Sequence, residues 1–392
     1  MPQRKSSKLI IFLIVFIDLL GFGMMIPMLP FFARHFGADA MQIGWLMFVY
    51  SFMQIFVSPL WGLLSDRFGR RPILLITIAG QAAAFLWGGF AAGYLSLLLS
   101  RVFAGAFAAN ISTASAYMAD ITTKEERAKG MGLIGAAFGL GFIFGPAIGG
   151  FLVSVGYEWP SLMAGIVSLI NLVFAFFILD EPIRSRLDRS QNRRRLSWEA
   201  YKKSFSSVYI FAPMILFFLL TLAFTQLEIV FGLFVSDRFF LNERDAGLMF
   251  AGMGIVMAIV QGGLIGRFVK KLGEIGVIRI GLPLVALGLL GLIEATNFWF
   301  LSGSLLVMAI GYSLANPCLS AITSKSADAS NQGSVLGIYQ SMGSLARVFG
   351  PLLAGFLYKR SQSAAFICAV LIVFMAQIIF ALVYRRSYTQ NL

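Results

Sequence analysis

The hydrophobic positions of this chain of 392 residues lie in long continuous runs instead of alternating with polar positions. A helix needs about 20 mainly apolar residues to cross the hydrocarbon layer, whereas the strands of a membrane barrel alternate apolar and polar residues. The runs therefore predict an all-α membrane protein with twelve transmembrane helices. Their centres fall near Leu20, Phe52, Ala83, Ala108, Phe142, Leu169, Leu222, Val256, Leu287, Gly311, Leu345 and Phe374.

Composition supports lipid as the solvent of most of the chain. Hydrophobic residues make up 58% of the sequence and charged residues 12%, about half the charged share of a soluble domain. The first apolar run, residues 9–32, is too long for the core of a signal peptide and is expected to remain as the first span. The two cysteines, Cys318 and Cys368, lie far apart in apolar runs and do not suggest a disulfide framework.

The formal net charge of +13 is explained by membrane topology. If the N-terminus is cytoplasmic and the spans alternate, most of the 31 Lys and Arg residues fall on the cytoplasmic side, which is the positive-inside pattern. We therefore expect a multi-pass membrane protein with both termini in the cytoplasm. Membrane lipids are expected to contact it, and nucleic acid is not an expected partner.

The sequence also repeats itself. Shifting it against itself aligns Gly145-Pro146 with Gly350-Pro351, and similar glycines and phenylalanines follow each pair. We interpret residues 1–183 and 208–392 as two pseudo-symmetric six-helix bundles, joined by a basic cytoplasmic linker at 184–207. Two such halves imply a central cavity that opens to one side at a time.

Four motifs resemble the major facilitator superfamily, and within it the twelve-helix drug/proton antiporters of the tetracycline-resistance type. They are the stretches 18–30, 62–72, 99–105 and 141–150, which occur in the expected order along the chain. The resemblance implies a proton-coupled antiporter that exports small amphiphilic compounds by alternating access. It further implies the bacterial inner membrane as the location, with a small-molecule substrate and protons as partners. We expect the protein to be a monomer.

The stretch 62–72 predicts a tight cytoplasmic turn, because Gly69 permits close backbone approach and Pro72 starts the next helix. Asp66 can pair with a nearby arginine or cap a helix. The resemblance implies that the loop holds the cytoplasmic ends of the halves together; the alternative is a topological anchor without a gating role. Its candidate residues are Gly62, Asp66, Arg67, Gly69, Arg70 and Arg71.

The stretch 141–150 combines a helix-kinking proline with small residues at helical spacing. Its candidate residues are Gly141, Gly145, Pro146, Gly149 and Gly150. Close helix packing is one interpretation of this antiporter motif. The other is a bent helix that lines the cavity wall, as the resemblance implies.

Two acids lie inside predicted spans. Asp18 follows Lys8 by ten residues, about 15 Å at helical rise, and Glu228 lies on the corresponding helix of the second half. A carboxylate at such a depth is costly unless it faces water, pairs or takes up a proton. Both are candidates for proton coupling, and a structural hydrogen bond is the alternative for Asp18.

Two arginines, Arg101 and Arg347, also lie inside spans. The resemblance implies that Arg101 takes part in a proton relay. Without the resemblance, the sequence leaves two roles open for Arg101, a proton relay or a fixed counter-ion. Asp18 is its expected partner. Arg347 could face an anionic group of the substrate or form a salt bridge. Other polar and aromatic residues suit a wet cavity or interhelical hydrogen bonds, namely Tyr50, Gln54, Asn110, Tyr117, Gln226, Phe231, Gln261, Asn316, Tyr339 and Gln340.

The sequence contains no His or Cys cluster for a metal, no phosphate-binding loop and no catalytic triad. We therefore expect no enzymatic activity and no cofactor, with the proton gradient as the energy source. Tetracycline antiporters carry ionisable residues where this chain has Met257 and Val285, which argues against tetracycline as the substrate. A symporter or facilitator for a sugar, lipid or other metabolite is the alternative function.

Overall fold

The computed structural model describes residues 3–108, 110–122, 127–182, 208–326 and 332–384, all of whose regular elements are helical. They are α1 (Gln3–Met25), η1 (Ile26–Met28), α2 (Leu29–His35), α3 (Ala40–Phe68), α4 (Arg70–Gly89), α5 (Tyr94–Phe107), α6 (Asn110–Ile121), α7 (Arg127–Val153), α8 (Trp159–Ile178), α11 (Val208–Phe239), α12 (Glu243–Ile259), η3 (Val260–Leu264), α13 (Ile265–Glu294), α14 (Phe298–Ser326), α15 (Gln332–Arg360) and α16 (Ala364–Tyr384). The predicted linker at 184–207 lies outside the described residues.

Within these residues, nine segments are long and apolar enough to cross a membrane. They are Ser7–His35, Ala40–Phe68, Arg70–Gly89, Tyr94–Ile121, Trp159–Ile178, Val208–Phe239, Glu243–Glu294, Phe298–Ser326 and Ala364–Tyr384. The run Glu243–Glu294 counts once, although Gly273, with φ 68°, interrupts its helical geometry. A shorter apolar segment spans Gly139–Val153. The chain is thus an all-helical, multi-pass membrane protein.

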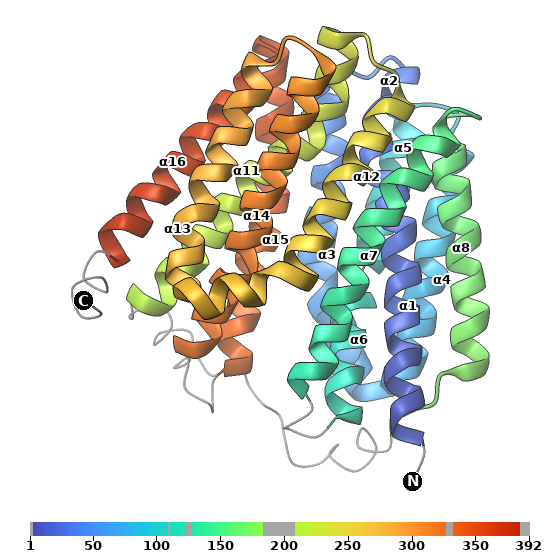
Figure 1. The fold of residues 1–392 in the computed structure, drawn as a ribbon. Helices are drawn as coiled ribbons and strands as arrows, with labels where there is room; N and C mark the ends of the chain where they lie inside the picture. Colours follow the sequence, from blue (N-terminus) through green and yellow to red (C-terminus); the bar gives the residue numbers. More distant parts are fainter. Residues whose placement is uncertain (1–2, 109, 123–126, 183–207, 327–331, 385–392) are drawn as a thin grey trace. The chain divides into compact units, whose positions relative to one another are not determined.

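The chain divides into two compact units. Unit 1 contains Met1–Arg193 and Leu241–Gly254, and unit 2 contains Arg194–Phe240 and Ile255–Leu392. In unit 1, α1 packs between α7 and α8, and α4 packs against α5 and α8 (Figure 1). In unit 2, α13 packs along α14, and α11 packs against α14, α15 and α16. The boundary between the units passes through α12.

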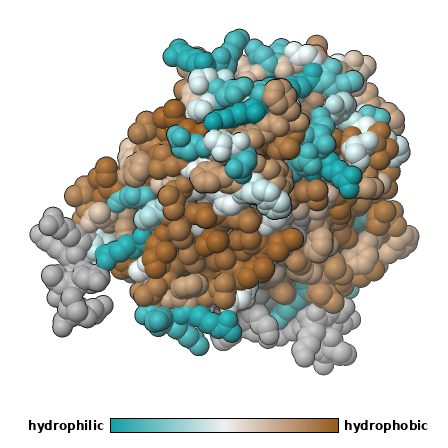
Figure 2. Space-filling view, turned by 45° about the horizontal axis from the view of Figure 1, so that its top comes forward, coloured by the Kyte–Doolittle hydropathy of each residue, from teal (hydrophilic) through white to brown (hydrophobic). Residues whose placement is uncertain are grey.

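Helix α8 shows how these sequences sort their side chains. Its exposed face carries large apolar residues at helical spacing, namely Ile166, Ile170, Val173 and Phe177, and its buried face carries Ala164, Ser168, Asn171 and Ala175. Small and weakly polar residues let membrane helices approach closely, while large apolar residues face lipid. Figure 2 shows the same preference on one face, where hydrophobic residues dominate the middle and hydrophilic ones gather toward two margins.

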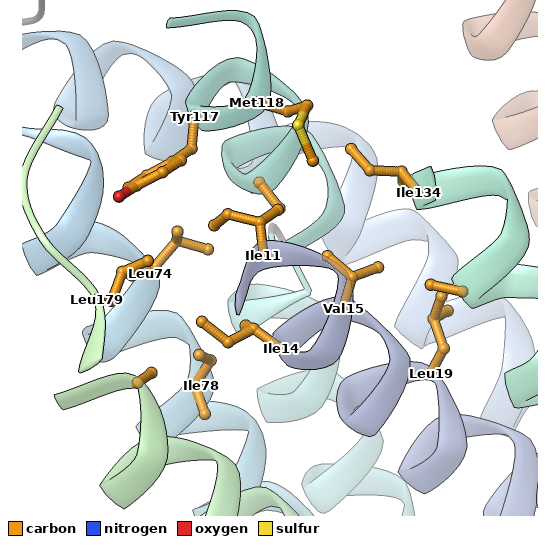
Figure 3. Close-up of a cluster of buried hydrophobic side chains, with 13 residues drawn as sticks. Ile11, Ile14, Val15, Leu19, Leu74, Ile78, Tyr117, Met118, Ile134 and Leu179 are labelled. Atoms are coloured by element: carbon orange, nitrogen blue, oxygen red, sulfur yellow. The ribbon is translucent and has the colours of Figure 1, made fainter. Parts of the chain in front are cut away.

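A hydrophobic cluster packs around α1 in unit 1. It joins Ile11, Ile14 and Val15 of α1 to Leu74 and Ile78 of α4, with Tyr117 and Met118 of α6 completing it (Figure 3). Ile14 and Val15 are 1% exposed. The face of α1 that carries these residues is therefore held in a close-packed core.

The span predicted near Ala108 corresponds to the segment Tyr94–Ile121, and its helical geometry is interrupted at Ala108. Helix α5 ends at Phe107 and α6 begins at Asn110, and the carbonyl groups released at the break accept hydrogen bonds from α3. Gln54 Nε2 donates to the Ala108 carbonyl at 2.9 Å, and Trp61 Nε1 donates to the Ala106 carbonyl at 2.7 Å. An interrupted membrane helix requires such partners because lipid offers none.

Candidate functional site

Asp18 and Asn110 meet inside unit 1. Asn110 is the first residue of α6, so the helix break after α5 brings its side chain to α1. Asn110 Nδ2 donates to Asp18 Oδ1 at 2.7 Å, and the Asn110 side chain is buried. The partner of this intramembrane carboxylate is thus a neutral amide, which can hold the group in place without fixing its charge.

Arg101 of α5 takes a position different from the predicted one. Its side chain is 1% exposed, and its guanidinium carbon lies 4.6 Å from the centre of the Tyr50 ring. Its Nε and Nη2 atoms make no hydrogen bond within the described residues. The expected ion pair with Asp18 is absent from the part of the chain that the structure describes, so that prediction was wrong. The break between α5 and α6 explains the difference, because it presents Asn110 to Asp18.

The loop between α3 and α4 is organised by Arg70. Its guanidinium contacts Asp66 at 2.6 Å, Asp120 at 3.0 Å and the Ser65 hydroxyl. Asp120 lies near the end of α6, Asp66 lies in α3 and Arg70 begins α4. One arginine therefore joins three helices of unit 1. This is a charged crosslink at a helix end, in which Asp66 remains 61% exposed.

Glu181, which follows α8, contacts this loop, and the sequence analysis missed it. Its two carboxylate oxygens accept the backbone N–H groups of Arg70 and Arg71, each at 2.8 Å, and so cap α4. Gly69 has φ 111°, a conformation that favours glycine, and an added Cβ there would lie 2.7 Å from the Glu181 carboxylate. The sequence signal was the pair of acids, Asp180 and Glu181, that follows the apolar run of α8.

We expect Glu181→Ala to lower the free energy of unfolding by about 1–2 kcal/mol, the usual loss for a helix cap. Thermal unfolding of the purified protein in detergent measures the effect. Glu158→Ala is the matched control, because Glu158 precedes α8 but makes no capping hydrogen bond. Equal stability of the two variants would contradict the capping role.

The antiporter motif packs α7 directly on α1. A Cβ atom added at Gly141 would lie 2.7 Å from Leu19 Cβ. A Cβ atom added at Gly145 would lie 2.6 Å from Gly23 Cα. Gly149 abuts the backbone of Met24 in the same way. These glycines bring the backbones of the two helices into contact one turn beyond Asp18, so two of the motifs found in the sequence meet in space.

Unit 2 holds a second cluster of candidates on one face of α11. This face carries Phe217, Phe224 and Glu228 at helical spacing. The Phe217 ring stacks on Tyr339 with centroids 4.0 Å apart, and the Phe224 ring stacks on Tyr312 with centroids 4.4 Å apart. The charge of Glu228 interacts with that of Arg347 on α15. The acid of unit 2 thus has a cation as its electrostatic partner, whereas the acid of unit 1 has an amide as its hydrogen-bond partner.

The other predicted cavity residues differ in setting. Gln261, Gln340 and Arg347 are exposed, and Asn316 is half-buried. Tyr117, Gln226 and Phe231 are buried. The Tyr117 hydroxyl donates to the Asp180 carbonyl and its ring belongs to the core of Figure 3, so we assign Tyr117 a packing role.

The described residues contain no group of three or more His, Cys, Asp or Glu side chains that could hold a metal ion. The candidate chemistry is therefore that of individual carboxylates and arginines within helices. Such groups can bind, orient and exchange protons or charged ligands.

Comparison with known proteins places this arrangement in context. The sequence model described as the Major Facilitator Superfamily matches residues 11–295 and 242–392. The chain is 31% identical to the tetracycline resistance protein, class C, of Escherichia coli over 92% of each chain. It is also 31% identical to multidrug resistance protein 2 of Bacillus subtilis, over 94% of this chain and 92% of the relative.

Solved structures show the same fold. A bacterial homolog of the human lysosomal transporter Spinster, in an inward-facing and unoccupied conformation, aligns with a TM-score of 0.79 at 14% identity over 98% of each chain. The human organic anion transporter MFSD10 aligns with a TM-score of 0.71 at 24% identity, over 97% of this chain and 100% of that chain. By the matches along its whole length, this chain belongs to the Major Facilitator Superfamily.

Proposed function

We propose that the chain is a proton-coupled antiporter that exports small amphiphilic compounds across the bacterial inner membrane by alternating access. Its relatives named as tetracycline and multidrug resistance proteins support this function. The proposal includes twelve spans in two six-helix halves around a central cavity, both termini in the cytoplasm, a monomeric state and no cofactor. The many basic residues of the segments expected on the inner side support that orientation.

The observation that carries the proposal is the hydrogen bond between Asn110 and Asp18. A carboxylate locked to an arginine stays ionised, whereas one bound to an amide can take up and release a proton as its access to water changes. The amide can donate to the carboxylate and still contact the carboxylic acid through its own oxygen. Asp18 is thus suited to carry the proton that is exchanged for substrate.

Glu228 is the proposed second proton site. Arg347 on α15 interacts with it electrostatically, and the Phe224–Tyr312 stack offers an apolar surface for a flat substrate. Substrate specificity is proposed to differ from that of tetracycline antiporters, because Met257 and Val285 are not ionisable. Val285 is buried where α13 packs on α14 near Gly311.

Transport by purified protein in lipid vesicles tests the function. Addition of a fluorescent lipophilic cation such as ethidium should dissipate a preset pH gradient, and a pH gradient should drive the dye across the bilayer. Vesicles without protein are the control. Movement of substrate and protons in the same direction would instead indicate a symporter, and movement indifferent to the gradient would indicate a facilitator.

A further inference from the structure

Glu228 and Arg347, the two charged candidates of unit 2, interact without forming an ion pair. Glu228 is half-buried on α11 and Arg347 is exposed on α15, and these two helices pack side by side with α14 (Figure 1). Their charges interact through space, yet no ion pair joins them in the part of the chain that the structure describes. The Arg347 guanidinium lies 3.5 Å from the Ser344 hydroxyl of its own helix. Of the two roles that the sequence left open for Arg347, the structure thus favours contact with an anionic group of the substrate over a salt bridge.

The packing of α11 on α15 sets the level of each charge. A Cβ atom added at Gly343 would lie 2.6 Å from the Phe217 ring and 3.7 Å from Arg347 Nη2. The guanidinium is therefore near the level of Phe217 along α11. Glu228 follows Phe217 by eleven residues, about 16 Å at helical rise. The two charges are thus spaced along the helices.

An aromatic stack lies at a level between the charges. Phe224 of α11 precedes Glu228 by one helical turn, and its ring stacks on Tyr312 of α14 with centroids 4.4 Å apart. Tyr312 interacts electrostatically with both Arg347 and Glu228. The stack and the two charges therefore form one group of side chains, contributed by three helices of unit 2. Phe224 is half-buried, so part of its surface stays open.

Each of the two charges can bind the opposite charge of a ligand. A guanidinium donates two parallel hydrogen bonds to a carboxylate, an ionised glutamate attracts a cation, and aromatic rings pack on flat ring systems. A ligand with a cation alone would leave the Arg347 donors without a carboxylate, and a ligand with an anion alone would leave Glu228 unmatched. A ligand with both charges and a ring system between them matches every member of the group.

We propose that Glu228, Arg347 and the Phe224–Tyr312 stack form a subsite for flat zwitterionic amphiphiles. The carboxylate of the ligand binds Arg347, its cationic group binds near Glu228, and its rings pack on the stack. The inference rests on the proposed function, because it names the class of substrate that the antiporter prefers. Lipophilic cations such as ethidium use Glu228 and the rings alone, and so bind more weakly.

Two dyes with the same ring system test this preference. Rhodamine 110 is a zwitterion at neutral pH, and rhodamine 123 is its methyl ester, which has the cationic rings but no carboxylate. Fluorescence anisotropy of each dye with the purified full-length protein in detergent gives its Kd. We expect the zwitterion to bind about tenfold more tightly than the ester, the effect of a hydrogen bond between charged groups.

Substitution of Arg347 shows whether this arginine causes the preference. Arg347→Gln should make the two Kd values equal, and Arg347→Lys, which keeps the charge but loses the planar pair of donors, should keep part of the preference. Arg360→Gln is the matched control, because Arg360 ends the same helix and lies over the Phe356 ring at 4.6 Å. It should keep the full preference. Equal Kd values in the parent protein, or a preference that survives Arg347→Gln, would overturn the subsite.

Glu228→Gln tests the other end of the subsite. Both dyes carry the cationic rings, so both Kd values should rise about fivefold, while binding through the aromatic rings persists. Unchanged binding of the ester by Glu228→Gln would contradict the placement of the cationic group. The melting temperature of each variant, measured in the same detergent, separates lost binding from lost folding.

The binding measurements need neither a pH gradient nor transport, so they separate the subsite from the proposed function. A protein that exchanges ethidium for protons but binds the two rhodamines equally would overturn the subsite and leave the antiport function intact. A protein that prefers the zwitterion but moves no dye against protons would contradict the antiport function and support the subsite.

Discussion

Asp18→Asn is expected to reduce dye efflux driven by a pH gradient to the level of vesicles without protein, while the folded yield and the melting temperature stay near those of the parent. The substitution keeps the size of the side chain and a hydrogen-bonding partner for Asn110, which binds Asp18 at 2.7 Å. It removes the group that can exchange a proton. Transport in vesicles and thermal unfolding in detergent measure the two effects separately.

Asp39→Asn is the matched control for this substitution. Asp39 lies outside the predicted spans and caps α3 by accepting the Gln42 backbone N–H at 2.8 Å, and asparagine caps helices as well as aspartate does. The same chemical change should therefore leave transport intact at position 39. Unchanged gradient-driven efflux by Asp18→Asn would remove Asp18 from the coupling mechanism.

Gly145→Val is expected to destabilise the protein by at least about 3 kcal/mol, the upper range for overpacking a close contact. Its Cβ would lie 2.6 Å from the Gly23 backbone, and backbone cannot yield as the end of a flexible side chain does. Helices α1 and α7 would have to separate next to Asp18. A lower melting temperature and a lower yield of monodisperse protein should follow.

Gly139→Val provides the comparison on the same helix. An added Cβ at Gly139 meets nothing within 4 Å, so its stability should change by less than about 1 kcal/mol. If both valine variants lost the same stability, the loss would come from helix propensity. That result would contradict a stabilising contact between α1 and α7 at Gly145.

The general architecture could be predicted from the chain because lipid imposes one strong requirement. Long apolar runs with small residues at helical spacing specify packed membrane helices whatever their neighbours are. The four motifs likewise identified the family, and the glycines of 141–150 already indicated close helix contact. Their partner on α1, the backbone near Gly23, needed the three-dimensional arrangement.

Side-chain partners were harder to predict because they depend on small breaks in the helices. The apolar run through Ala108 gives no signal of a break, yet that break places Asn110 beside Asp18 and leaves Arg101 over Tyr50. Glu181 was missed because its role depends on α8 ending beside α4, over a long separation in sequence. For Arg70, the sequence predicted a contact with a nearby acid, and Asp66 is one of the two acids that the guanidinium contacts.

The central claim is that protons bound to the buried acids are exchanged for substrate, and proton release from purified protein tests it most directly. Ethidium added to the protein in weakly buffered detergent solution should release protons as it binds, detected with a pH-sensitive dye. The Asp18→Asn/Glu228→Gln variant should bind ethidium and release none. Binding by the parent protein without any proton release would contradict the account.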